Sequence, residues 1–273
     1  MEPFKSFLKH SGFNFSPDSI TWKILRERVL TATTLSVLLE QVVYLLVAAG
    51  VIQKSEFAKN YSAAAQRFYR TSDLTRALIL GSPTDSRNAA RTINTTHKQV
   101  MGSLHEDVGI YKKGTQFSAF DPQLIQWVWA TFASKMIVGY ERLIEPLADS
   151  EKDRFVAELS NIVVYLGGKA DSFPKSYPAL QAYISEMIST RTVEVTSVSI
   201  QIADHLLTLS SPVGRLSKPI PKMFAIGFIN EELREQYGLS WSKAEEQFFS
   251  LTCKTVQRAV SNLPPRIRFA LRD

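Results

Sequence analysis

The chain has 273 residues, of which 45% are hydrophobic, so it is long enough to bury a large core and has the composition of a globular protein. Its net charge of +6 comes from basic residues scattered along the chain, which argues against nucleic-acid binding, and its single cysteine, Cys253, excludes an intrachain disulfide. No apolar run reaches the length of a membrane-spanning helix, about 20 residues, and no signal peptide is recognisable. We therefore expect a cytoplasmic protein without transmembrane segments, for which peripheral association with a membrane is compatible with the sequence.

The first part of the chain predicts helices separated by turn residues. Residues 1–15 are expected to form a flexible arm, after which Pro17-Asp18-Ser19 supplies the chemistry of a helix start. Apolar residues then continue at helical spacing from Trp22 towards Gly50, as one long helix or two. A further helix is expected to end at the turn of residues 81–85, and another helix to follow that turn.

In the two helices that flank this turn, polar side chains share a stripe with apolar ones. Arg67 and Thr71 are followed by Leu74 and Leu78 at helical spacing, so the four side chains lie on one face. The second helix is predicted to carry an apolar stripe with a histidine at its middle. This stripe consists of Ala90, Ile93, His97, Val100, Met101 and Leu104. We therefore predict that His97, Arg67 and Thr71 face one interior.

The middle of the chain predicts two more helices from their capping residues. Asp121-Pro122 combines an N-cap with a proline at the first helical position, so a long helix should start there and run towards Pro146. Residues 150–153 have nearly the layout of a capping box, and the helix that follows should end at Gly167-Gly168.

The last third of the chain is also predicted to be helical. Residues 210–221 contain three prolines and predict an ordered surface loop. Helices are expected over residues 180–191, 193–209 and 223–237, and from Ser240 or Ser242 to residue 263. Because no alternating strand pattern of useful length occurs, we predict an all-α fold in which residues 16–273 form a single domain.

Few kinds of site chemistry are compatible with these residues. There is no Glu-x-x-His pair for a di-iron site, no Gly-rich phosphate loop and no nucleophile elbow, and the histidines and Cys253 lack zinc-ligand spacing. Haem is different, because one imidazole and hydrophobic burial suffice to hold it. Helical spacing favours His97 and His205 equally as that ligand, and a core histidine with no ligand role is the plain alternative.

Five motifs occur in a fixed order along nearly the whole chain. They are QVVYLLVAAGVIQKSEF over residues 41–57, Arg67-x-x-x-Thr71, His97-x-x-Val100-x-Gly102, Phe120-Asp121-Pro122 with Trp127-Val-x-Ala-Thr131, and Tyr237-Gly-Leu-Ser-Trp241. Their order and spacing resemble the MpaB and latex-clearing-protein (rubber oxygenase) catalytic-domain family. The resemblance implies a helical protein with a globin-like core that binds haem b and uses dioxygen on a small apolar substrate, terpenoid-like or polyketide-like.

The resemblance also assigns roles to particular residues. It makes His97 the proximal iron ligand and places Arg67 and Thr71 on the distal side, where they would act on oxygen. Arg70 stands where rubber-cleaving members carry a lysine, and it is expected at the cavity rim or beside a haem propionate. The pocket wall is expected to include Trp127 and Thr131.

Each of these roles has a structural alternative. Arg67 would then only neutralise a propionate, and the Thr71 hydroxyl would only bond the carbonyl four residues earlier. Trp127 would then be an ordinary core residue. No carboxylate clearly matches the base proposed in rubber oxygenases, the nearest one upstream being Glu56. Two function classes therefore follow, a haem-dependent oxygenase or a non-catalytic helical protein that binds haem without turnover or lacks a cofactor.

Overall fold

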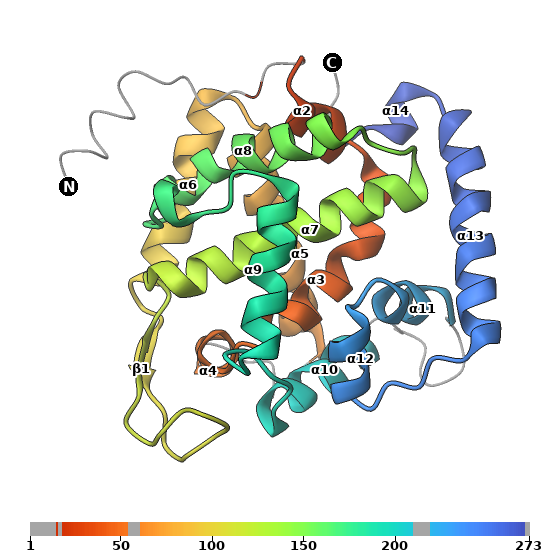
Figure 1. The fold of residues 1–273 in the computed structure, drawn as a ribbon. Coiled ribbons are helices and arrows are strands. Elements are labelled where there is room, and N and C mark those ends of the chain that lie inside the picture. The colour runs from red at the N-terminus through yellow and green to blue at the C-terminus, as the bar shows by residue number, and fades with distance from the viewer. Residues whose placement is uncertain (1–14, 16–17, 54–60, 210–218, 271–273) are drawn as a thin grey trace.

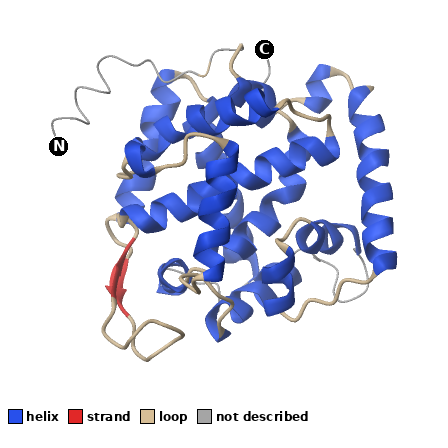
Figure 2. Ribbon diagram, viewed as in Figure 1, coloured by secondary structure: helices blue, strands red, loops and turns tan. Residues whose placement is uncertain are grey.

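The computed structural model describes residues 15, 18–53, 61–209 and 219–270, so the predicted arm lies outside the described residues except for Phe15. The described chain is a bundle of helices with a small two-stranded sheet at its edge (Figures 1 and 2), which confirms the all-α class. Strands β1 (Met101–Ser103) and β2 (Gln116–Ser118) pair antiparallel, with Met101 opposite Ser118. The sequence did not predict this sheet, because strands of three residues are too short to show an alternating pattern.

Helix α7 (Pro122–Leu143) is the central helix, with 14 of its 22 residues buried. It begins as predicted, because the Asp121 carboxylate accepts a hydrogen bond from the backbone N–H of Gln123 at 2.8 Å and Pro122 occupies the first turn. Its neighbours are the 3-10 helix η1 (Arg28–Thr33), α3 (Thr34–Gln41), α8 (Asp149–Tyr165), α9 (Tyr177–Ser189) and α13 (Lys243–Ser261).

The predicted helix or helix pair between Trp22 and Gly50 is wrong, because the chain breaks there several times. It forms α2 (Ile20–Leu25), η1, α3 and α4 (Leu45–Gln53), and Ser19 caps α2 as expected. In η1 the hydroxyls of Thr31 and Thr33 donate to carbonyls three residues earlier, which favours the tighter 3-10 turn. No single helix in the described chain is long and apolar enough to cross a membrane; segments 28–41 and 45–53 qualify only together, and they are bent by 106°.

Helices α5 (Tyr61–Leu80) and α6 (Pro83–His97) lie side by side, separated by the predicted turn. Ser82 and Asp85 form a capping box at the start of α6. The predicted stripe through residues 100, 101 and 104 is wrong, because α6 ends at His97. The backbone beyond it pairs with the β2 segment instead, and the Leu104 N–H donates to the Thr115 carbonyl at 3.0 Å.

The capping box predicted at residues 150–153 is also wrong. Helix α8 begins at Asp149, and the carboxylate of Glu151 accepts the N–H of Ala148 at 2.9 Å. Asp153 instead accepts the N–H of Tyr177 at 2.7 Å, which ties α8 to the start of α9. The helix ends near the predicted glycines, where Gly167 has a φ of +92° that favours glycine.

The last helices differ from prediction mainly at prolines and caps. Helix α10 (Ser197–Leu209) starts four residues later than expected. The single helix predicted over residues 223–237 is divided into two helices, α11 (Pro219–Gly227) and α12 (Glu231–Gln236), because Asn230 caps the second. Pro219 and Pro221 occupy the first turn of α11, where proline is tolerated, so they are not loop residues as predicted; residues 210–218 lie outside the described chain. Ser242 caps α13 as expected, and a short α14 (Pro265–Arg268) follows.

A buried ion pair joins the central helix to α3. The Nζ atom of Lys135 lies 2.7 Å from Oε1 of Glu40, and only 8% and 2% of these side chains are exposed. The same Glu40 oxygen accepts the backbone N–H of Asn230 at 2.7 Å, and the Trp127 indole donates to the Glu40 carbonyl at 3.2 Å. One residue of α3 therefore binds α7 and the start of α12 together.

Replacing Lys135 by methionine should test this pair. The buried Glu40 carboxylate would lose its counter-charge, so we expect Lys135→Met to lower the free energy of unfolding by about 3–5 kcal/mol. Urea denaturation measures the change. The control is Lys112→Met, which removes an exposed pair with Asp107 and should cost at most about 1 kcal/mol. Equal losses in the two variants would contradict a special role for the buried pair.

Candidate functional site

His97 lies at the end of α6, with its ring half-buried against Phe120. The two rings meet edge-on, with centroids 5.9 Å apart and an interplanar angle of 79°. The Nδ1 atom of His97 is buried and has no hydrogen-bond partner among the described residues. Burial lowers the pKa of His97 below its ordinary value, so the imidazole is neutral at pH 7. A neutral ring with an unsatisfied buried nitrogen has the properties of a metal ligand.

The other histidines differ from His97 in their surroundings. His105 and His205 are exposed, and the Nδ1 atom of His205 lies 2.8 Å from the Gln201 carbonyl oxygen. His10 lies outside the described residues. Helical spacing alone favoured His205 as much as His97, whereas the structure places His205 on the solvent side of α10. His97 is therefore the described histidine with a buried ring nitrogen that lacks a partner.

Helix α4 packs directly against the chain that follows His97. A Cβ atom at Gly50 would lie 2.9 Å from Cγ1 of Val100, so only glycine allows the two segments to approach this closely. Gly102 is similarly enclosed, because a Cβ atom there would lie 3.0 Å from the Phe117 ring and 3.2 Å from the Gln53 amide. That amide donates to a β1 carbonyl at 2.7 Å. Two of the predicted motifs, residues 41–57 and the His97 motif, thus meet in space.

A further motif, Phe120-Asp121-Pro122, lies next to these two at the start of α7. The Ala119 N–H donates to the Val100 carbonyl at 2.9 Å, which places the next residue, Phe120, against the His97 ring. Asp121 then caps α7. The residue beside the His97 ring thus lies between the hydrogen bond to Val100 and the cap of the central helix.

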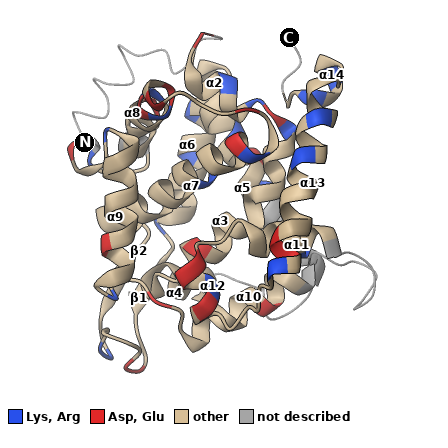
Figure 3. Ribbon diagram, turned by 45° about the vertical axis from the view of Figure 1, so that its right-hand side comes forward, with Lys and Arg blue, Asp and Glu red and all other residues tan. Residues whose placement is uncertain are grey.

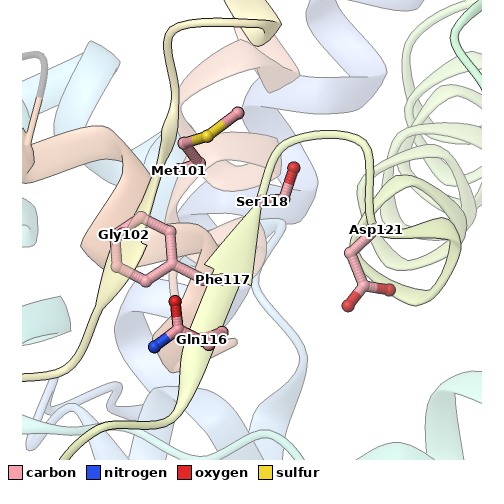
Figure 4. Close-up of a pocket in the computed structure, with 6 residues that line it drawn as sticks. All are labelled: Met101, Gly102, Gln116, Phe117, Ser118 and Asp121. Atoms are coloured by element: carbon pink, nitrogen blue, oxygen red, sulfur yellow. The ribbon is translucent and has the colours of Figure 1, made fainter.

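An open pocket of about 390 Å³ lies beside this arrangement, on the hairpin (Figure 4). The Asp121 carboxylate stands at one end of it, across from the Phe117 ring and the Gln116 amide. The sequence could not indicate this pocket, since it depends on the pairing of two strands that were not predicted. Its lining consists of Met101, Gly102, Gln116, Phe117, Ser118 and Asp121.

The remaining candidate residues lie on α5 and α7. Trp127 and Thr131 are fully buried; the Trp127 indole donates to the Glu40 and Gln41 carbonyls, and the Thr131 hydroxyl donates to the Trp127 carbonyl at 2.9 Å. Both pack in the core of α7, so their place on a pocket wall stays a prediction.

On α5, Arg70 and Thr71 are exposed, and the side chain of Arg67 is not among those that the structure describes. The oxygen-directed roles of Arg67 and Thr71 and the rim position of Arg70 therefore stay predictions. The described chain holds no group of three or more His, Cys, Asp or Glu side chains arranged for a metal ion, and Cys253 is buried as a small core residue.

Comparison with known proteins decides the family. The family described as "ER-bound oxygenase mpaB/B'/Rubber oxygenase, catalytic domain" matches residues 22–258. The chain belongs to this family. The mpaB/rubber oxygenase membership indicates an oxygenase, and hence an enzyme that uses dioxygen on a small molecule.

Similar curated proteins carry no described activity. The chain is 22% identical over 224 residues to the uncharacterized proteins Mb2261 of Mycobacterium bovis and Rv2237 of Mycobacterium tuberculosis, covering 80% of this chain and 83% of each relative. No solved structure shows significant similarity to the chain.

The close approach of Gly50 and Val100 can be tested by a double-mutant cycle. Gly50→Ala should lower the free energy of unfolding by about 1–3 kcal/mol, because overpacking against Val100 exceeds the helix propensity that alanine gains. In a Val100→Ala background the same substitution should be neutral or stabilising. Urea denaturation of the four proteins gives the coupling, and strictly additive effects would contradict the contact.

Proposed function

We propose that this chain is a haem b-dependent oxygenase, with His97 as the proximal iron ligand, that acts with dioxygen on an apolar terpenoid-like or polyketide-like molecule. The observation that carries the proposal is the Nδ1 atom of His97, which is buried and has no partner within the described part of the chain. Membership in an oxygenase family supports it, as do the contacts that bring residues 41–53, 97–102 and 119–121 together near this ring. The globin-like character of the core is part of the same proposal.

The residues around His97 fit the requirements of haem in three respects. The imidazole is neutral because burial lowers its pKa, so its ring offers a lone pair without prior loss of a proton. Phe120 supplies an apolar wall beside it, and the contact of Gly50 with Val100 fixes the chain just after it. Haem, when bound, supplies the oxygen chemistry, and the protein supplies an axial ligand and a pocket that excludes water.

Residues of α5 have the next role in this proposal. Arg67 and Thr71 stand four positions apart in α5, the spacing at which helical residues share a face. The guanidinium of Arg67 and the hydroxyl of Thr71 would donate hydrogen bonds to the oxidant and stabilise the negative charge that develops on it. Arg70 would pair with a propionate at the rim, since its permanent charge makes it a poor iron ligand.

The alternative is a non-catalytic helical protein, which binds haem without turnover or has no cofactor. One observation favours it: Trp127 and Thr131 are fully buried, and their polar atoms are bonded to backbone carbonyls rather than directed at a ligand. A purified protein that is colourless and takes up no added haem would support this alternative.

Haem content in three alanine variants tests the ligand assignment. We expect the purified parent to show a Soret band that shifts with carbon monoxide after reduction, and His97→Ala to lose it. His105→Ala and His205→Ala are matched controls, because both side chains are exposed, and they should keep full haem content. The assignment is wrong if His97→Ala keeps its haem with an unchanged spectrum while His205→Ala loses it.

The double variant Arg67→Gln with Thr71→Val tests the α5 residues. Loss of both donors should slow oxygen-dependent turnover by roughly tenfold or more, at about 1.4 kcal/mol per decade, while haem content and melting temperature stay near the parent values. Single-turnover kinetics and thermal melts measure the two effects. Loss of haem or of the fold, with normal reactivity of any remaining holoprotein, would show that these residues serve structure instead.

A further inference from the structure

Helix α13, at one edge of the molecule (Figure 1), has two faces of different character. Its inner face buries Phe249, Cys253 and Val260 against the bundle. Its outer face carries Phe248 and Leu251, which are 54% and 61% exposed although both are large and apolar. The sequence pattern did not separate these side chains, because Phe248 and Phe249 both belong to the same apolar run.

Basic residues accompany the exposed apolar ones. Lys254 and Arg258 follow Leu251 by three and seven residues, so they lie on the same outer face, and both are exposed. The carboxylates of this helix, Glu245 and Glu246, are confined to its first turn, where one caps the helix and the other accepts the indole N–H of Trp241. Beyond the first turn, the outer face of α13 therefore combines apolar and positive side chains, and the exposed Glu245 lies at its start, one turn before Phe248.

The next helix, α14, also exposes an apolar and a basic residue. Ile267 is 59% exposed and Arg266 is exposed beside it. Basic residues gather along α13 and α14 in Figure 3. We call this surface the α13–α14 face; its members are Phe248, Leu251, Lys254, Arg258, Arg266 and Ile267.

We propose that the α13–α14 face docks the protein on an anionic membrane surface. Apolar side chains of such a helix enter the boundary between headgroups and acyl chains, while lysines and arginines contact the lipid phosphates. The three positive side chains of this face match an anionic lipid surface; phenylalanine and arginine also occur at protein–protein interfaces, so association with a protein is the competing outcome of the test. The proposal uses no residue of the His97 site and does not depend on the proposed oxygenase chemistry.

Vesicle sedimentation with the full chain tests the proposal. We expect the protein to bind vesicles of phosphatidylcholine with phosphatidylserine, to bind pure phosphatidylcholine weakly, and to dissociate as salt screens the charges. The variants Phe248→Ser with Leu251→Ser, and Lys254→Glu with Arg258→Glu, should each lower the partition coefficient tenfold or more. Circular dichroism should show that both remain folded, because all four side chains are exposed.

The matched control is Lys112→Glu with Lys113→Glu, on the hairpin away from α13 (Figure 1). It changes the net charge by the same amount and stands beside another exposed apolar residue, Ile110. We expect it to bind vesicles nearly as the parent does. The proposal is overturned if the parent does not bind anionic vesicles, if the hairpin variant loses binding as much as the α13 variants, or if sedimentation velocity shows that Phe248 and Leu251 instead hold a dimer together.

Discussion

The buried carboxylate of Glu40 is the constraint on which the rest of the described fold depends. A charge removed from water must be paired and hydrogen-bonded, and Glu40 satisfies this only when Lys135 of α7 and the N–H of Asn230 reach it together. Its backbone carbonyl meanwhile accepts the Trp127 indole. Segments far apart in the sequence are thereby fixed to the central helix. The residues just before this helix, Phe120 and Asp121, lie beside His97 and the chain that follows it.

The site is connected to this core through short, local contacts. The Val100 carbonyl accepts the Ala119 N–H, and Gly50 leaves just enough space for the Val100 side chain. These contacts explain why glycines and small residues recur in the motifs on either side of His97. The ring beside these contacts has a buried nitrogen that no described residue bonds, and such a nitrogen is costly in a folded protein unless something else bonds to it.

What the sequence predicted well is local chemistry. Ser19, Asp121 and Ser242 cap helices as expected, because an N-cap needs only the next few backbone N–H groups. What it predicted poorly depends on contacts far along the chain. The helix stripe through His97 was extended past its end because residues 100–104 are apolar at helical spacing, whereas pairing with residues 115–119 makes them a strand. His97 as a ligand stays a prediction, and burial rather than helical spacing separates it from His205.

The central claim is the proposal that His97 binds haem iron through its imidazole ring. Substitution by glycine, with free imidazole supplied in solution, tests this most directly, because the small molecule can replace the missing ring without restoring any other contact. If the account is correct, His97→Gly protein takes up haem only when imidazole is added, and the parent spectrum returns with it. Haem uptake that is the same with and without imidazole would contradict the account, as would a protein that stays haem-free in both.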